Sequence, residues 1–427
     1  MAIFDIFRWR GSDKVYTLPW LRNRIEYSSD PKRIAEYAKR AFTRSRLTIS
    51  LLTQFHLSKD SIVVSEDDHA RFVRKHLVSY LPPAGEFPGI ANELVRAVFA
   101  ENDGPDGERT IHLSNELIRE VYLSLLSNIL GATLLRPLTD YINDIDFKPS
   151  QRPLHLEGLM YAFGLHLPGF LPLRRFTDWW FYKTDRRTRL IARKLEQLVI
   201  DFSVPNEGSW YAALLELKAS GKITMAQFRG ELTSIFVSSF SVSAAISSML
   251  LCLAARREYF RKIHDDPDFA KCFVNEVLRM YPPFRQFGYE RKRGVCSGGG
   301  SKRPGPEPTD FMIAVLALHK NPGAWENPEL FYPERFLEPG PVSGAKFLPF
   351  GIGTRSCPGR SYSLTLMTRI LNHVCSDQFT VWFGLPADYR RDARGMPVGT
   401  DNRLISFPID DRLTYRRPKS EESSHAR

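Results

Sequence analysis

FLPFGIGTRSCPG, residues 347–359, is the stretch around which the rest of the chain can be interpreted. It places Cys357 at the end of a glycine-rich loop, just before a predicted helix from Ser361 to Cys375. Glycines let a backbone turn tightly and approach a flat ligand closely, and N–H groups at a helix start stabilise a thiolate. Because a buried thiolate without a metal is costly, we expect this loop to present a sulfur ligand to a metal.

The loop resembles the haem-binding signature of the cytochrome P450 family, Phe-Gly-x-Gly-x-Arg-x-Cys-x-Gly. Every position of the signature is filled, by Phe350, Gly351, Gly353, Arg355, Cys357 and Gly359. The resemblance implies haem b, with Cys357 as the axial ligand of its iron. It also implies that Arg355 contacts a haem propionate, since a guanidinium matches a carboxylate bidentately. The alternative, a buried cysteine in an ordinary loop, does not explain the complete match.

Motifs elsewhere in the chain support this resemblance. Glu276 and Arg279 lie three apart on one predicted helix and share a face; alone, such a pair is usually a surface ion pair. Here YPP (281–283), HKNP (319–322) and PERF (333–336) follow, in the order of the family's E-x-x-R and P-E-R-F motifs. The resemblance implies that Glu276, Arg279 and Arg335 form a buried charge cluster of structural importance behind the haem loop.

A second propionate contact in the family comes from a helix near the front of the chain. That helix usually carries His or Trp followed four residues later by Arg. His69 fits the first position, but the arginine, Arg74, lies five residues further on. We therefore take His69 and Arg74 as candidate cofactor contacts, with a solvated basic helix face as the alternative of equal weight.

The predicted helix on the oxygen side of the haem departs from the family pattern. The family usually carries Asp or Glu followed by Thr, which deliver protons as general acids. Counting 35 residues back from Glu276 reaches Ser241, preceded by Phe240. We take Ser241 and Phe240 as the catalytic candidates. Ser241 and Ser238 could hold water, or these serines could simply be small residues that let a cofactor approach; both interpretations stay open.

Composition limits the other classes of function. The chain has 427 residues, of which 43% are hydrophobic, and a net charge of +11 with a pI of about 9.4. This charge would suit nucleic acid, an anionic membrane surface or an acidic protein, but no helix-turn-helix or zinc pattern supports nucleic-acid binding. Five cysteines without a C-x-x-C pair indicate neither a disulfide framework nor a zinc site and favour a reducing compartment.

These patterns predict a mainly α protein with the P450 fold, a helical prism with small β-sheets that buries the haem between a long distal helix and the proximal Cys357 loop. We expect one domain over residues 1–427, with a shortened N-terminal region (about 1–60) and a disordered tail (418–427). The clearest predicted segments are helices at Asp67–Tyr80, Glu93–Ala100, Leu113–Leu135, Arg174–Phe202, Thr224–His264 and Asp268–Tyr281, and a strand at Ser61–Ser65.

Two segments bear on localisation. The uncharged run from Ser234 to Ala255 contains seven serines, so we interpret it as a buried helix and not as a membrane span. The first ten residues, MAIFDIFRWR, are too few and too charged to cross a bilayer, although they could lie on its surface. We expect a cytoplasmic protein, soluble or peripherally membrane-associated, without a transmembrane anchor.

The resemblance implies a haem-thiolate monooxygenase that hydroxylates an apolar small molecule, or cyclises or joins it oxidatively, in secondary metabolism. Since no flavin or iron–sulfur motif is present, electrons would come from a ferredoxin or an NADPH-dependent reductase. The basic residues Arg71, Arg74, Lys75 and Arg360 suit an acidic partner. The unusual oxygen-side helix leaves two alternatives, an oxygen-independent isomerase or dehydratase and a non-catalytic haem-binding protein.

Overall fold

The computed structural model describes residues 14–18, 23–38, 42–44, 61, 67–80, 87–99, 108–145, 190–291, 309–338, 344–401 and 405–416. Several predictions lie outside these residues. They concern the first ten residues, four of the five positions of the Ser61–Ser65 strand, the first part of the Arg174–Phe202 helix, and the tail 418–427.

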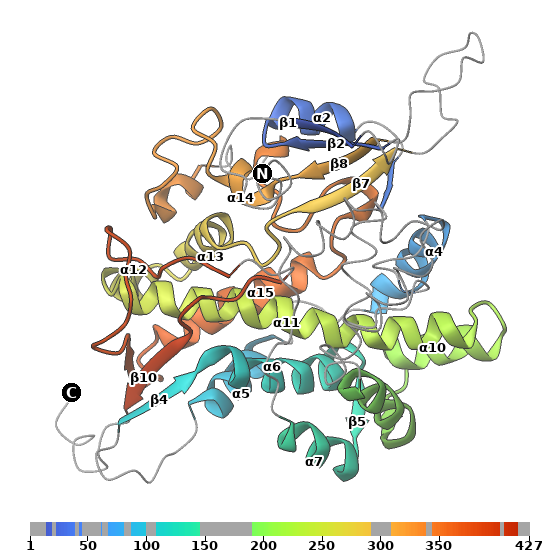
Figure 1. The fold of residues 1–427 in the computed structure, drawn as a ribbon. Helices are drawn as coiled ribbons and strands as arrows, with labels where there is room; N and C mark the ends of the chain where they lie inside the picture. The colour runs from blue at the N-terminus through green and yellow to red at the C-terminus, as the bar shows by residue number, and fades with distance from the viewer. Residues whose placement is uncertain are drawn as a thin grey trace, which may run out of the picture.

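The described residues are mainly helical, with small sheets, as the sequence predicted (Figure 1). The α-helices are α2 (Pro31–Ala38), α4 (Asp67–Leu77), α5 (Phe87–Val98), α6 (Leu113–Ser124), α7 (Arg136–Asp144), α10 (Trp210–Ala219), α11 (Met225–Ala255), α12 (Glu258–Asp265), α13 (Phe269–Met280), α14 (Val315–His319) and α15 (Arg360–Val374). Residues 190–202 are also helical. Short helical turns are η1 (Val78–Tyr80), η3 (Leu125–Ile129, of the π type), η5 (Pro333–Phe336), η7 (Gly344–Lys346) and η8 (Gly353–Arg355).

The strands of the described residues form three sheets. The largest has the strand order β1 (Lys14–Leu18), β2 (Asn23–Ser28), β8 (Thr309–Ile313), β7 (Phe287–Arg291) and β3 (Phe42–Arg44), and only its β2–β8 pair is parallel. The second joins β4 (Glu108–His112), β10 (Arg412–Arg416) and β9 (Trp382–Gly384), and the third pairs β5 (Ala132–Leu134) with β6 (Ser203–Pro205). The N-terminal region predicted to be shortened thus supplies three strands that flank the segments after α13.

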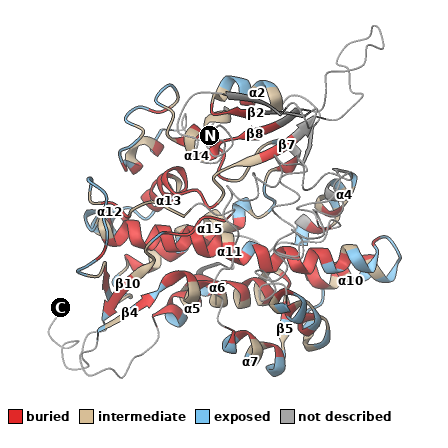
Figure 2. Ribbon diagram, in the orientation of Figure 1, coloured by how far each residue is buried: buried red, intermediate tan, exposed pale blue. Residues whose placement is uncertain are grey.

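Helix α11 is the core of the molecule. Its first turn is closed by a capping box, in which the side chain of Thr224 accepts from the N–H of Gln227 and the side chain of Gln227 accepts from the N–H of Thr224. Helix α6 packs along it, and most of its length is buried (Figure 2). It is long and apolar enough to cross a bilayer, but 89% of its most apolar window is buried inside the protein.

Two of the predicted helices were too long. Thr224–His264 is divided into α11 and α12 because the backbone leaves helical geometry at Arg256, with φ −125° and ψ 68°. Leu113–Leu135 is divided into α6, η3 and β5. The chain turns into β5 at Gly131, whose φ is +60° and where a Cβ atom would lie 2.6 Å from the Cβ of Ser209, so only glycine fits there.

Candidate functional site

A cavity of about 280 Å³ separates α11 from the loop that carries Cys357. Its wall is mostly apolar and comes from α4, η3, α11, the segment after α13, the cysteine loop and α15. Cys357 is exposed at this wall, across the cavity from the residues of α11. A thiol at this position can reach a ligand that fills the cavity.

The loop before Cys357 is folded by its own backbone. The N–H of Cys357 donates to the carbonyl of Phe350 at 2.8 Å, and the N–H of Ser356 donates to the carbonyl of Gly353 at 3.1 Å. Gly351 has a φ of +75°, a left-handed conformation that other residues rarely adopt. Helix α15 begins at Arg360, three residues after the cysteine. The structure thus brings Phe350, Cys357 and Gly359 together in the cavity wall, and Gly351 lies in the same turn next to Phe350.

Two guanidinium groups share the cavity wall with Cys357. Arg355 is only 4% exposed, and Arg74 reaches the cavity from α4 and donates a hydrogen bond to the carbonyl of Ser356. His69, one turn earlier on α4, is not among the lining residues. Its Nε2 lies 3.2 Å from a carboxylate oxygen of Glu231 on α11. Of the two candidates on this helix, the structure therefore brings Arg74, and not His69, to the cysteine loop.

The opposite wall is a stripe of α11 that includes Ser234, Ser238 and Ser241. The Ser241 hydroxyl donates to the carbonyl of Ser238 at 3.0 Å. Phe240 is buried outside the cavity lining, where its ring meets that of Phe236 edge-on at 5.1 Å. The two catalytic candidates thus occupy different faces of the helix, and Ser241 is the one that borders the cavity.

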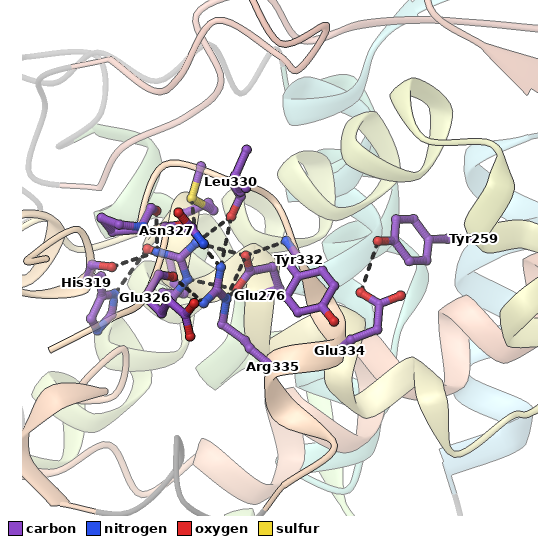
Figure 3. Close-up of polar contacts among 12 residues, drawn as sticks. Tyr259, Glu276, His319, Glu326, Asn327, Leu330, Tyr332, Glu334 and Arg335 are labelled. Carbon is purple, nitrogen blue, oxygen red and sulfur yellow. Dashed lines mark hydrogen bonds and ion pairs between the residues drawn. The ribbon is translucent and has the colours of Figure 1, made fainter.

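The residues of the predicted charge cluster are in contact (Figure 3). Arg279 donates two hydrogen bonds to the carboxylate of Glu276, with Nε–Oε2 and Nη2–Oε1 distances of 2.7 and 2.8 Å. Arg335 lies 3.2 Å from the same carboxylate, which also accepts from the N–H of Tyr332 at 2.7 Å. Both Glu276 and Arg279 are fully buried. The guanidinium of Arg279 also donates to the carbonyls of His319, Pro328 and Leu330, so it ties α13 to the segment 319–330.

Comparison with known proteins identifies the family. Residues 189–377 match the family model described as Cytochrome P450. Over these residues, which include α11, the charge cluster and the cysteine loop, the chain has the pattern of the cytochrome P450 family. The mainly helical architecture with small sheets agrees with that fold, and members of this family bind haem through a cysteine thiolate. The predicted family, fold and cofactor are thereby confirmed.

Several similar P450 relatives are plant proteins. The chain is 26% identical to ent-cassadiene C11-alpha-hydroxylase 1 of Oryza sativa subsp. japonica over 294 residues, 60% of this chain and 55% of that protein. It is 27% identical to cytochrome P450 71AV8 of Cichorium intybus over 226 residues, 45% of each chain. It is 33% identical to dimethylnonatriene synthase of Arabidopsis thaliana over 106 residues, 24% of this chain and 20% of that protein. The chain thus spans about half or less of the length of these relatives.

The donor set of the cavity fits the P450 cofactor. The haem of this family has a thiolate ligand on one face, and its apolar ring and two carboxylates suit apolar surroundings and nearby cations. Cys357, the apolar wall and the guanidinium groups of Arg74 and Arg355 match these needs. The other described cysteines, Cys252, Cys272 and Cys375, are buried away from the cavity, and burial raises the pKa of the Cys375 thiol to about 12.

His319 connects the charge cluster to the cysteine loop. Its Nε2 accepts from the N–H of Leu348 at 2.9 Å, and its Nδ1 lies 3.2 Å from the carbonyl of Arg279. Burial, with the nearby Arg279 charge, lowers the pKa of His319 to about 3. The imidazole is therefore neutral. Because Nε2 accepts a hydrogen bond, Nδ1 carries the proton and donates to the backbone carbonyl of Arg279. The HKNP motif is visible in the sequence, but the sequence alone does not predict the two hydrogen bonds of His319.

Glu231 is a cavity residue that the sequence motifs do not indicate. Its carboxylate is 2% exposed and lines the cavity. The available signal was helical periodicity, because Glu231 lies 7 and 10 residues before Ser238 and Ser241, which places all three on one helix face. The family usually has its acidic residue next to the position of Ser241, whereas Glu231 lies about three turns earlier on the helix.

Proposed function

We propose that this P450 is a haem-thiolate monooxygenase that oxidises an apolar small molecule, with Cys357 as the axial ligand. The observation that carries the proposal is the exposure of Cys357 at the wall of an apolar cavity, opposite α11. The relatives named as hydroxylases support this reaction class. Their plant origin supports a role in secondary metabolism.

Different residues of the cavity would bind the haem and the substrate. Cys357 would ligate the iron, and Arg355 and Arg74 would hold the carboxylates of the haem. When bound, haem supplies the chemistry that activates dioxygen. The apolar side chains of η3 and of the 283–287 segment, including Leu125, Phe284 and Phe287, would orient the substrate and exclude bulk water.

The overall reaction requires a separate electron donor. One substrate C–H bond, one dioxygen, two electrons and two protons give one C–OH group and one water. A ferredoxin or an NADPH-dependent reductase would supply the electrons. The exposed residues Arg71, Lys75 and Arg360 lie on α4 and α15, which flank the cysteine loop, and they would attract an acidic partner.

The ligand assignment is tested by exchange of the cysteine. Cys357→His should abolish the red-shifted absorption of the reduced carbon monoxide complex, because an imidazole does not donate electron density as a thiolate does. Cys375→Ala is the matched control, since that cysteine is buried outside the cavity lining, and it should keep the wild-type spectrum. An unchanged spectrum in Cys357→His would refute the assignment.

A second candidate is an oxygen-independent isomerase or dehydratase. It is favoured by the surroundings of Ser241, whose neighbours in the cavity wall, Val237 and Val242, are apolar and not acidic. Such an enzyme would form product without consuming NADPH or dioxygen. Product formation that requires both, in a stoichiometry of one to one, would exclude it.

A further inference from the structure

A buried polar cluster at the edge of the cavity joins α4 to the first turns of α11. His69 contributes both ring nitrogens, with Nε2 3.2 Å from Oε1 of Glu231 and Nδ1 3.1 Å from Nε2 of Gln227. The side chain of His69 is 10% exposed and that of Glu231 is 2% exposed. Glu231 is the only acidic residue among those that line the cavity in the described part of the chain.

The hydrogen bonds of this cluster determine where the proton of His69 resides. The Oε1 atom of Gln227 accepts from the N–H of Thr224 at 2.8 Å, so the amide orientation is fixed and its Nε2 can only donate. Nδ1 of His69 must therefore accept from Gln227. The imidazole proton is then on Nε2, where it donates to the carboxylate of Glu231. His69 thus orients Glu231 and cannot pass protons through its ring while Gln227 occupies Nδ1.

Serine hydroxyls continue from Glu231 along the same face of α11. Ser234, Ser238 and Ser241 follow it at intervals of three, four and three residues, and all line the cavity. Each hydroxyl donates to a carbonyl of its own helix, Ser234 to Gly230, Ser238 to Ser234 and Ser241 to Ser238. Their oxygens can also accept from water. Neighbouring members are about 4.5–6 Å apart along the axis, a separation that one bridging water can span.

We propose that Glu231 is the acid–base residue that delivers protons to the oxygen side of the cavity, with His69 as its positioning residue. The inference rests on the proposed monooxygenase function, whose stoichiometry consumes two protons. The Glu231 carboxylate takes a proton from water at the N-terminal end of α11. It returns that proton to the waters held by Ser234, Ser238 and Ser241. The charge of Glu231 is restored at each transfer, so the residue is not consumed.

The position of Glu231 accounts for the departure seen in the sequence. The family acid is missing beside Ser241, and the cavity instead has its carboxylate three turns earlier on the same stripe. A carboxylate this deeply buried is costly unless it is hydrogen-bonded, and His69 supplies such a bond from another helix. The capping box then has two functions, because Gln227 both closes the first turn of α11 and fixes the tautomer of His69.

The first test measures hydrogen peroxide released per electron pair delivered by an NADPH-dependent reductase to the haem-loaded protein. Glu231→Gln keeps the size and the hydrogen bond but cannot exchange protons, so it should raise this ratio several-fold. Ser238→Ala should raise it less, because water can partly fill the gap. The control is Glu196→Gln, since Glu196 pairs with Arg229 outside the cavity lining. The control should match the wild type.

The second test needs no turnover. In protein without haem, labelled with ¹⁵N-histidine, the His69 resonances should show a protonated Nε2 and a hydrogen-bonded, unprotonated Nδ1. Glu231→Gln should shift the Nε2 resonance. In the first test, His69→Gln should release less peroxide per electron pair than His69→Ala, because its amide can still donate to Glu231. Peroxide release at the wild-type ratio in Glu231→Gln would overturn the proposal. Absence of the red-shifted carbon monoxide spectrum in the wild type would instead overturn the proposed function.

Discussion

At the scale of single residues, Gly351 shows how one backbone angle supports the sulfur ligand. Its φ of +75° reverses the chain between Phe350 and the η8 turn. A Cβ atom at this position would lie 3.4 Å from the hydroxyl of Tyr289, which is tight but not forbidden. The larger cost is conformational, because residues with a Cβ rarely adopt this angle.

We predict that Gly351→Ala lowers the free energy of unfolding by about 1–2 kcal/mol and also weakens haem retention. Gly399→Ala is the matched control, because Gly399 has a φ of +69° with no atom within 4 Å of its ideal Cβ position. The control should show a similar loss of stability with normal haem retention. Chemical denaturation and the rate of haem transfer to apomyoglobin measure the two effects. Equal haem retention in the two variants would contradict the role of Gly351.

The sequence predicted the cysteine side of the site better than the oxygen side. A signature such as that around Cys357 encodes local backbone geometry, so it can be interpreted without the fold. Counting back from Glu276 placed Ser241 on the cavity wall, but it gave Phe240 the same status. Adjacent helical residues point about 100° apart, and only the packing of Phe240 against Phe236 shows which face is buried. Glu231 and His69 depend on contacts between distant helices, which spacing alone does not reveal.

At the scale of elements, His319 couples α13 to the cysteine loop through two hydrogen bonds. The carbonyl of residue 319 also accepts from Arg279 at 2.7 Å, and its ring packs against Phe347 with centroids 5.3 Å apart. The charge cluster and the start of the loop are therefore held in one relative position. This link depends on an imidazole that stays neutral.

Burial lowers the pKa of His319 from its ordinary value of 6.5 to about 3, and this predicts a pH dependence of stability. Between these values the unfolded chain binds a proton that the folded chain does not. The free energy of unfolding should therefore be highest above pH 6.5 and fall as the pH falls, by up to about 1.4 kcal/mol per pH unit. His319→Gln retains a donor and an acceptor but does not titrate, so its stability should fall less between pH 6.5 and pH 4.

The stability of the wild type and of His319→Gln is compared by measuring their denaturant midpoints across this pH range. Parallel curves for the wild type and His319→Gln would contradict the buried neutral imidazole. His319→Leu supplies the complementary variant, because it removes both hydrogen bonds. It should lower the fraction of protein with the red-shifted carbon monoxide spectrum, whereas His319→Gln should restore it.

Element boundaries were harder to predict than the elements themselves. Hydrophobic periodicity found α6, α11 and α13, because each buries a face against the core. The predicted helices extended too far where apolar residues continue into a turn or a strand, as at Gly131 and at Arg256. Those ends depend on tertiary contacts, such as the approach of Gly131 to Ser209, and not on the local pattern.

At the scale of the whole molecule, the buried charge of Glu276 joins parts of the chain that are distant in sequence. Helix α13, the segment 319–332 and η5 meet at this carboxylate and its two arginines (Figure 3). Because α13 also packs on α11 and α15, the cluster connects the segment 319–332 and η5 to the helices on both sides of the cavity. Its loss should therefore affect global stability and not a single loop.

We predict that Glu276→Gln lowers the free energy of unfolding by about 3–5 kcal/mol, because Arg279 and Arg335 would keep their charges in the interior without the carboxylate. Glu334→Gln is the matched control. Glu334 lies nearby but pairs with Lys262, which is 42% exposed, so its loss should cost less than about 1 kcal/mol. Urea denaturation followed by tryptophan fluorescence and by far-ultraviolet circular dichroism should give coincident transitions for Glu276→Gln. A small shift equal to that of the control, or a transition confined to one probe, would show that the cluster stabilises only its own segment.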